Sequence, residues 1–194
     1  MSVLGNGLYE VKHHEDALSV GEAELSMLRR LGASEAYTLV VQSNLANTYR
    51  ALGRLEPALR LQGDVYSGIL RLEGEESRNT LLEANNYASY LISLKRLEEA
   101  KTLLSRIIPT AQRVLRETDT VTLRIRWNYA RALYKDDGAT LDGLREAVTT
   151  LKETERTARR VLGGPHPLTM KIEESLRETR AVLRARETPS PGSA

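Results

Sequence analysis

Residues 38–61 read TLVVQSNLANTYRALGRLEPALRL, and this stretch decides the fold because the chain repeats it twice. The second copy, TLLEANNYASYLISLKRLEEAKTL, begins at Thr80, and the third, TLRIRWNYARALYK, begins at Thr122. Both offsets are 42 residues, and the residues that coincide are Asn44, Asn86 and Asn128, together with Ala46, Ala88 and Ala130. A fixed period of roughly 20 to 50 residues indicates a repeat architecture.

After Tyr134 the register slips by 5 residues through DDGATLDG and then recovers, which indicates a loop insertion. The junctions between copies also repeat: RLGASEAYTL, RLEGEESRNTL, RVLRETDTVTL and RVLGGPHPLTM begin at Arg30, Arg71, Arg113 and Arg160. We interpret each junction as the end of one helix and the start of the next.

Each copy has the apolar spacing of two amphipathic helices. The break falls at Gly53, which can adopt the positive φ that ends a helix, and Pro57 follows in the first turn of the second helix. Small residues should let the paired helices approach closely. They are Ala46, Ala58, Ala88, Ala100, Ala130 and Ala147.

The motif N-L-A-x-x-Y at residues 44–49, followed by Ala58, resembles the tetratricopeptide repeat family. The 42-residue period and the junction LGGPHPLT at residues 162–169 are similar to the kinesin light chain branch, whose junctions run L-G-x-D-H-P-x-T. This resemblance implies an all-α, right-handed solenoid of antiparallel helix pairs, with about four units and a C-terminal capping helix.

The resemblance covers roughly residues 1–186. We expect units at about 1–37, 38–79, 80–121 and 122–168, a capping helix at 169–186, and a disordered tail at 187–194. The first unit starts partway through its first helix. Either a truncated helix caps this end, or the chain is a piece of a longer array.

In tetratricopeptide arrays the first helix of each unit lines a concave groove, so the resemblance implies a peptide-binding surface. The residues at the corresponding positions are Ser43, Asn44, Asn47 and Arg50; Asn85, Asn86, Ser89 and Ser93; and Trp127, Asn128, Arg131 and Lys135. Asn side chains can pair with the N–H and C=O groups of an extended peptide. Alternatively, the recurring asparagines hydrogen-bond between neighbouring helices and fix the stacking of the repeats.

The segment from Arg113 to Lys135 has six basic residues against Glu117 and Asp119, a net charge of +4. This excess would suit an acidic peptide, although a solvated arginine-rich face has the same pattern. Trp127 could stack on a ligand, or its ring could be wedged between the first helix of its own unit and the next unit. Both alternatives stay open.

The sequence also excludes several classes of function. With no Cys and no nucleotide-binding or hydrolase motif, we expect no enzyme and no cofactor. Neither the cluster His13-His14-Glu15-Asp16 nor the run of Asp136, Asp137 and Asp142 has metal-ligand spacing, so we expect no metal site. A net charge of +2 argues against general nucleic-acid binding. No run of 18 apolar residues could cross a membrane, and we expect a cytoplasmic protein.

We therefore predict a protein–protein interaction module that binds an extended, acidic peptide segment in the concave groove. The alternative is a structural scaffold subunit, or a segment of a larger assembly, held by its convex or end faces. In that case the N-terminal end would mediate self-association or continue into a longer array.

Overall fold

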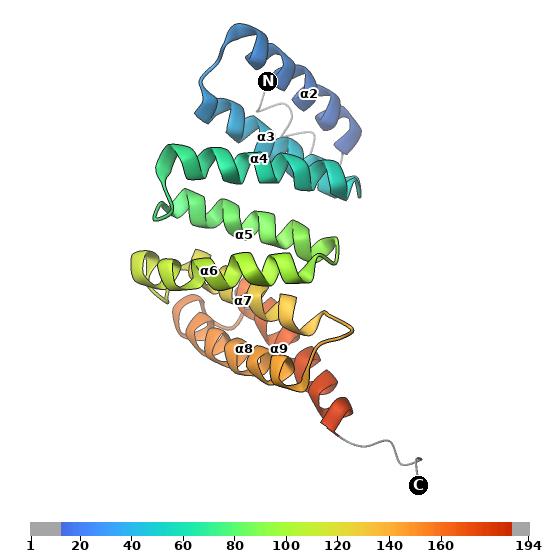
Figure 1. The fold of residues 1–194 in the computed structure, drawn as a ribbon, viewed down its shortest axis with the longest axis vertical. Helices are drawn as coiled ribbons and strands as arrows, with labels where there is room; N and C mark the ends of the chain where they lie inside the picture. Colours follow the sequence, from blue (N-terminus) through green and yellow to red (C-terminus); the bar gives the residue numbers. More distant parts are fainter. Residues whose placement is uncertain (1–12, 188–194) are drawn as a thin grey trace. The chain divides into compact units, whose positions relative to one another are not determined.

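A computed structural model describes residues 13–187 of the chain. These residues form helices and no strand, which confirms the predicted all-α class (Figure 1). The predicted first helix before residue 13 and the tail after residue 187 lie outside the described residues. The helices are α2 (His14–Leu31), α3 (Glu35–Ala51), α4 (Leu55–Glu73), α5 (Arg78–Ser93), α6 (Leu97–Leu115), α7 (Thr120–Tyr134), α8 (Leu141–Leu162) and α9 (Pro167–Glu187).

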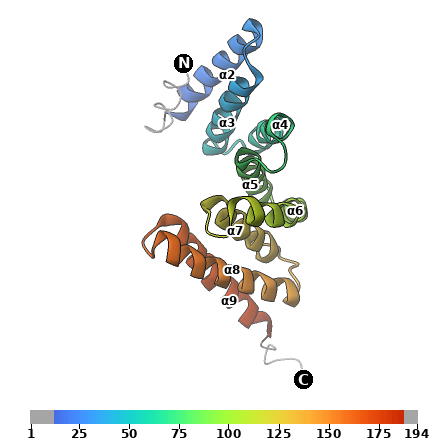
Figure 2. The same ribbon diagram turned by 90° about the vertical axis from the view of Figure 1, so that its left-hand side faces the viewer.

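The chain divides into two compact units, Met1–Leu94 and Lys95–Ala194. In the first unit, each helix from α2 to α5 packs against the next in the chain. In the second unit, α6 to α9 do the same, and α7 also contacts α9. Figure 2 shows α2 and α3 side by side as one hairpin. Helix follows helix through short turns, as the repeat pattern predicts.

The helices that open the three later predicted units, α3, α5 and α7, each begin at a capped residue of a repeated junction. The hydroxyl of Ser34 accepts a hydrogen bond from the backbone N–H of Tyr37, and Ser77 and Asp119 cap α5 and α7 in the same way. At the start of α9, His166 Nδ1 accepts a hydrogen bond from the backbone N–H of Leu168 at 3.1 Å. Because these caps satisfy N–H groups that have no partner inside the helix, they fix where each helix restarts.

The turns after α3 and α5 use the left-handed conformation. Gly53 has φ 72°, as the sequence predicts, and Lys95, one 42-residue period later, has φ 61°. A glycine adopts this conformation without a Cβ penalty, whereas a lysine does not. The second turn therefore keeps the same backbone conformation, although it has a lysine in place of the preferred glycine.

The predicted alanines are packing residues. All six are completely buried, as expected for small residues at positions where helices pack closely. They are Ala46, Ala58, Ala88, Ala100, Ala130 and Ala147, each with 0% exposure.

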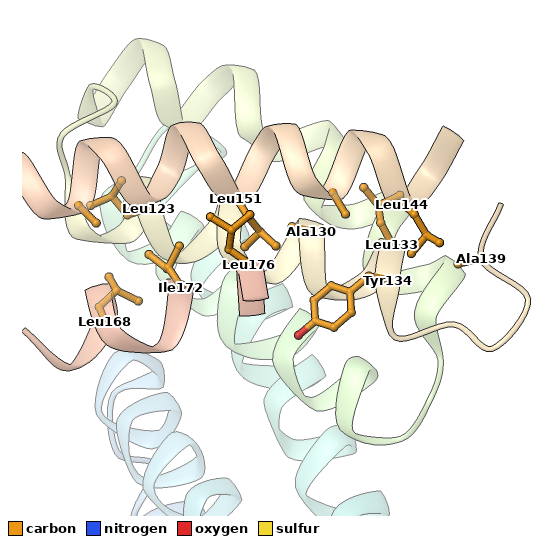
Figure 3. Packing of buried hydrophobic residues seen from close by; sticks show 12 residues of the cluster. Leu123, Ala130, Leu133, Tyr134, Ala139, Leu144, Leu151, Leu168, Ile172 and Leu176 are labelled. Carbon is orange, nitrogen blue, oxygen red and sulfur yellow. The ribbon is translucent and has the colours of Figure 1, made fainter. Parts of the chain in front are cut away.

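The core of the second unit is formed by α7, α8 and α9 (Figure 3). Leu123 of α7, Leu144 and Leu151 of α8, and Ile172 of α9 are fully buried in it. Leu168 and Leu176 extend the contribution of α9 along the same side of that helix. The smaller cluster of the first unit includes Leu18, Leu25, Leu28, Val41 and Leu45.

Candidate functional site

The predicted site residues lie on α3 and α5 in the first unit and on α7 in the second. On α3, Asn47 makes the bond that joins two of these helices, because its Oδ1 accepts a hydrogen bond from the hydroxyl of Tyr90 on α5 at 3.2 Å. Its Nδ2 donates to the carbonyl of Ser43 at 3.1 Å. Asn44, the residue that recurs in all three copies, is half-buried beside it. Asn47 therefore makes a hydrogen bond between helices of the kind that the sequence suggested for Asn44.

Arg50 is the exposed cation of this surface. Its guanidinium lies 5.3 Å from the centroid of the Tyr90 ring, and its Nη2 donates to Asn47 Oδ1 at 3.4 Å. These contacts hold the charged group over the junction of α3 and α5 while leaving it open to solvent.

On α5, Asn86 is half-buried and donates to Glu83 Oε2 at 3.2 Å. The same carboxylate oxygen accepts a hydrogen bond from Nε2 of Gln62 on α4 at 2.6 Å, and Gln62 is almost fully buried. Asn85 is buried, whereas Ser89 is half-buried and Ser93 is exposed. Of the two predicted asparagines of α5, Asn86 is therefore the more accessible one.

On α7, the side chain of Trp127 is hydrogen-bonded to a residue of α9. Its Nε1 donates to the hydroxyl of Ser175 on α9 at 2.9 Å, and the ring packs against the core of the second unit. The guanidinium of Arg131 lies 4.8 Å from the indole centroid and donates to Oδ1 of the buried Asn128 at 2.8 Å. The indole thus lies between α7 and α9, in the wedged position that was one of the two alternatives.

Next to this group, the hydroxyl of Tyr134 donates to Glu178 Oε2 of α9 at 2.9 Å, and Lys135 Nζ lies 5.7 Å from the Tyr134 ring centroid. Burial lowers the pKa of Arg131, against the opposing influence of Tyr134 and Glu178. Burial also raises the pKa of Tyr134 to about 12, and the bond to Glu178 acts in the same direction. Lys135 is half-buried and makes no ion pair within the part of the chain that the structure describes.

The raised tyrosine pKa values predict a loss of stability at alkaline pH. Burial, and then the hydrogen bond to Glu146, raise the pKa of Tyr129 to about 12 as well. Above pH 10 the tyrosines of the unfolded chain ionise while Tyr129 and Tyr134 stay protonated in the folded chain. We therefore expect the free energy of unfolding to fall between pH 10 and pH 12.

Urea unfolding at pH values from about 9 to 12 measures this effect, followed by circular dichroism. The double substitution Tyr129→Phe and Tyr134→Phe removes both ionising groups, so its stability should fall less steeply over the same range. Equal slopes for the two proteins would contradict the assignment.

The sequence did not identify three of the groups that shape these surfaces: Tyr90, Ser175 and Glu178. Tyr90 and Ser175 contact the predicted residues Asn47 and Trp127 from a different helix, and Glu178 contacts Tyr134, which was not predicted either. The partners lie 43 to 48 positions apart in the chain. The position of Tyr90 on its helix, next to Ser89, could be predicted from the repeat alignment. Its hydrogen bond to Asn47 could not.

Within residues 13–187, no group of three or more His, Asp or Glu side chains could hold a metal ion. In the same range, no helix is both long enough and apolar enough to cross a membrane.

Comparison with known proteins identifies the fold. Residues 38–79 match the family model of the tetratricopeptide repeat. Two crystal structures of kinesin light chain-like TPR repeats from Podosopora anserina, one of them a variant, superpose on the chain with TM-scores of 0.78 and 0.72. Their sequences are 20% and 19% identical to this one, and the alignments cover 96% and 99% of this chain and 86% and 95% of those chains.

BtubC from P. vanneervenii superposes with a TM-score of 0.62 at 16% identity, over 100% of this chain and 82% of that chain. No curated protein has significant sequence similarity to the chain. Residues 38–79 thus form a tetratricopeptide repeat, and the chain has the fold of kinesin light chain-like repeat proteins. Tetratricopeptide repeats generally act as modules for protein–protein interaction.

Proposed function

We propose that this chain binds extended, acidic segments of a partner protein on its groove-type helices, which are α3 and α5 in the first unit and, separately, α7 in the second. The observation that carries the proposal is the charge of α7. This helix contains three arginines and no acidic residue, and Lys135 follows directly at its C-terminal end. A helix face of this kind offers charge-assisted hydrogen bonds to the carboxylates of a ligand.

The polar residues of α7 form a stripe. At 3.6 residues per turn, positions i, i+4, i+7 and i+11 lie on one side of a helix, and α7 has Arg124, Asn128, Arg131 and Lys135 at these positions. Arg131 and Asn128 are bonded to each other. Arg124 is exposed and Lys135 is half-buried, and neither has a carboxylate partner among residues 13–187. The two ends of the stripe are therefore the cations available to a ligand.

Their separation sets the spacing of the ligand. Arg124 and Lys135 are 11 residues apart, which corresponds to about 16 Å along a helix axis. An extended chain rises about 3.3 Å per residue, so about five residues span this distance. A segment lying along α7 would therefore present acidic residues about five positions apart.

In the first unit, the surface of α3 and α5 supports the same mode of binding without a charge excess. Asn47 and Asn86 are half-buried, and Arg50 is exposed beside Asn47. Amides can pair with the backbone of an extended segment whatever its side chains are. We propose that this surface binds backbone, whereas α7 selects acidic side chains.

Fluorescence anisotropy tests the proposal with a labelled peptide that has two glutamates about five positions apart. The double substitution Arg124→Glu and Lys135→Glu should weaken binding at least about tenfold and reduce its salt dependence. Lys152→Glu is the matched control, because Lys152 is exposed on α8, away from the stripe. Equal weakening by the control, or none by the double substitution, would refute the role of α7.

A scaffold function remains the second candidate, and exposed apolar side chains favour it. Nine large apolar residues in the described part of the chain are exposed, and four of them, Met27, Leu31, Tyr37 and Val40, lie on α2 and the start of α3. Exposed apolar side chains gathered in one region are typical of interaction surfaces. Sedimentation velocity separates the two functions, since a scaffold subunit should self-associate without any added peptide.

A further inference from the structure

A groove lies in the first unit, between α2 and α4. Its volume is about 580 Å³, and the side chains of Leu45 and Tyr49 on α3 contribute to its lining. Successive helix residues are turned by about 100°, so Leu45 and Tyr49 point away from the side of α3 that carries Asn44 and Asn47. The groove is therefore separate from the peptide-binding surface proposed above.

Part of the lining of this groove is apolar. Leu25 of α2 and Leu45 of α3 are nearly buried, and Pro57 and Leu61 of α4 are half-buried. Ser26 is an exposed residue on the α2 side. Covering these apolar groups would stabilise a complex by removing their remaining surface from water.

Cations border the apolar lining. Arg29, Arg30 and Arg60 are exposed, and none of them forms a hydrogen bond or ion pair within residues 13–187. Elsewhere in the same unit, by contrast, Arg54 pairs with Glu15 and Arg71 pairs with Glu35.

The position of Arg29 and Arg30 in the last turn of α2 is favourable for the helix dipole by itself. Arg60 is not near the C-terminal end of α4, so the dipole does not explain it. The lining also contains two acidic residues, Glu22, which accepts a hydrogen bond from the Tyr49 hydroxyl, and Asp64. The three arginines outnumber these two carboxylates, so the border has an excess of positive charge.

We infer that this α2/α4 groove binds an acidic amphipathic helix of a partner protein. Apolar residues at positions i, i+3 or i+4, and i+7 of that helix would cover Leu25, Leu45 and Leu61, while flanking carboxylates pair with the three arginines. The lining of α2 runs from Glu22 to Arg30, about 12 Å along the axis, which corresponds to a little over two turns of a bound helix.

The probe is a blocked helical peptide of about 14 residues, with leucines on one face and glutamates elsewhere. Its control has lysines in place of the glutamates. Binding to the full chain is measured by isothermal titration calorimetry, and amide chemical shifts report which helices are contacted. We expect the glutamate peptide to bind with shifts confined to α2, α3 and α4, and the lysine peptide to bind at least about tenfold more weakly.

Two variants change different properties of the groove. Ser26→Trp fills it without altering any charge, and Arg60→Glu reverses one border charge. Each should weaken binding of the glutamate peptide at least about tenfold, and Lys152→Glu should not. Circular dichroism checks that both variants keep the parent fold, and since Arg60 is exposed and unpaired, its replacement tests the groove even if Ser26→Trp unfolds.

Several results would overturn the inference. One is equal binding of the two peptides, and another is binding unaffected by Arg60→Glu. Competition by the extended acidic peptide would place the probe on the groove-type helices instead. Self-association of the chain that disappears in Arg60→Glu would make a second copy the occupant.

Discussion

Leu151→Ala should lower the free energy of unfolding of the second unit by about 2–5 kcal/mol. Leu151 is fully buried on α8, and the cluster around it includes Leu123 from α7 and Ile172 from α9 (Figure 3). Shortening the side chain removes its burial and leaves a cavity in contact with three helices. These helices are held by the same cluster and by the close approach at Ala130 and Ala147, so they cannot collapse easily around the cavity.

Trp127 makes the measurement specific. It is the only tryptophan of the chain and packs against the same cluster, so urea unfolding followed by its fluorescence reports on the second unit. Val161→Ala on α8 is the matched control. Val161 is 44% exposed, and its truncation should change stability by about 0.5 kcal/mol or less. Similar losses for both variants would show that the cluster is not the core of this unit.

Arg116→Gly should instead stabilise the chain, by about 1–3 kcal/mol. Arg116 follows α6 with φ 71° and ψ 160°, a conformation that is essentially restricted to glycine. Gly74 and Gly163 occupy the equivalent positions after α4 and α8, with φ 81° and ψ 173°, and φ 83° and ψ 162°. The Arg116 side chain is exposed and has no hydrogen bond within the described residues, so its removal sacrifices no contact.

Thermal and urea unfolding measure the gain. Arg177→Gly is the control, because Arg177 is exposed on α9 with ordinary helical geometry, and the same substitution there should destabilise by about 1 kcal/mol. Opposite signs at the two positions would attribute the effect to the backbone conformation. A loss of stability in Arg116→Gly would show that this junction does not need the left-handed conformation.

Much of the fold could be predicted because it depends on local, periodic properties of the sequence. The alanines mark helix contacts whatever their neighbours are, and Gly53 marks a turn by its own conformational freedom. The positive φ angles of Lys95 and Arg116 could not be predicted from residue type. They follow from the geometry of the repeat, which imposes the same turn on residues that do not favour it.

The candidate site was less predictable, because its contacts join helices that are distant in the sequence. Asn44, Asn86 and Asn128 are equivalent in the alignment, but their surroundings are not the same. Asn128 is buried and accepts a hydrogen bond from Arg131, whereas Asn86 is half-buried and donates one to Glu83. Their surroundings differ because the residues that neighbour them differ from one copy to the next. Alignment therefore predicts the position of a side chain on its helix better than its accessibility.

The last turn of α9 has a consequence for the inserted turn that precedes α8. Arg186 donates hydrogen bonds to the backbone carbonyls of Asp137, at 2.7 Å, and Ala139. Every amino acid has a main-chain oxygen, so these two hydrogen bonds do not depend on the side chains of Asp137 and Ala139. The end of α9 therefore holds the backbone of this turn through contacts that a substitution at Asp137 would leave in place.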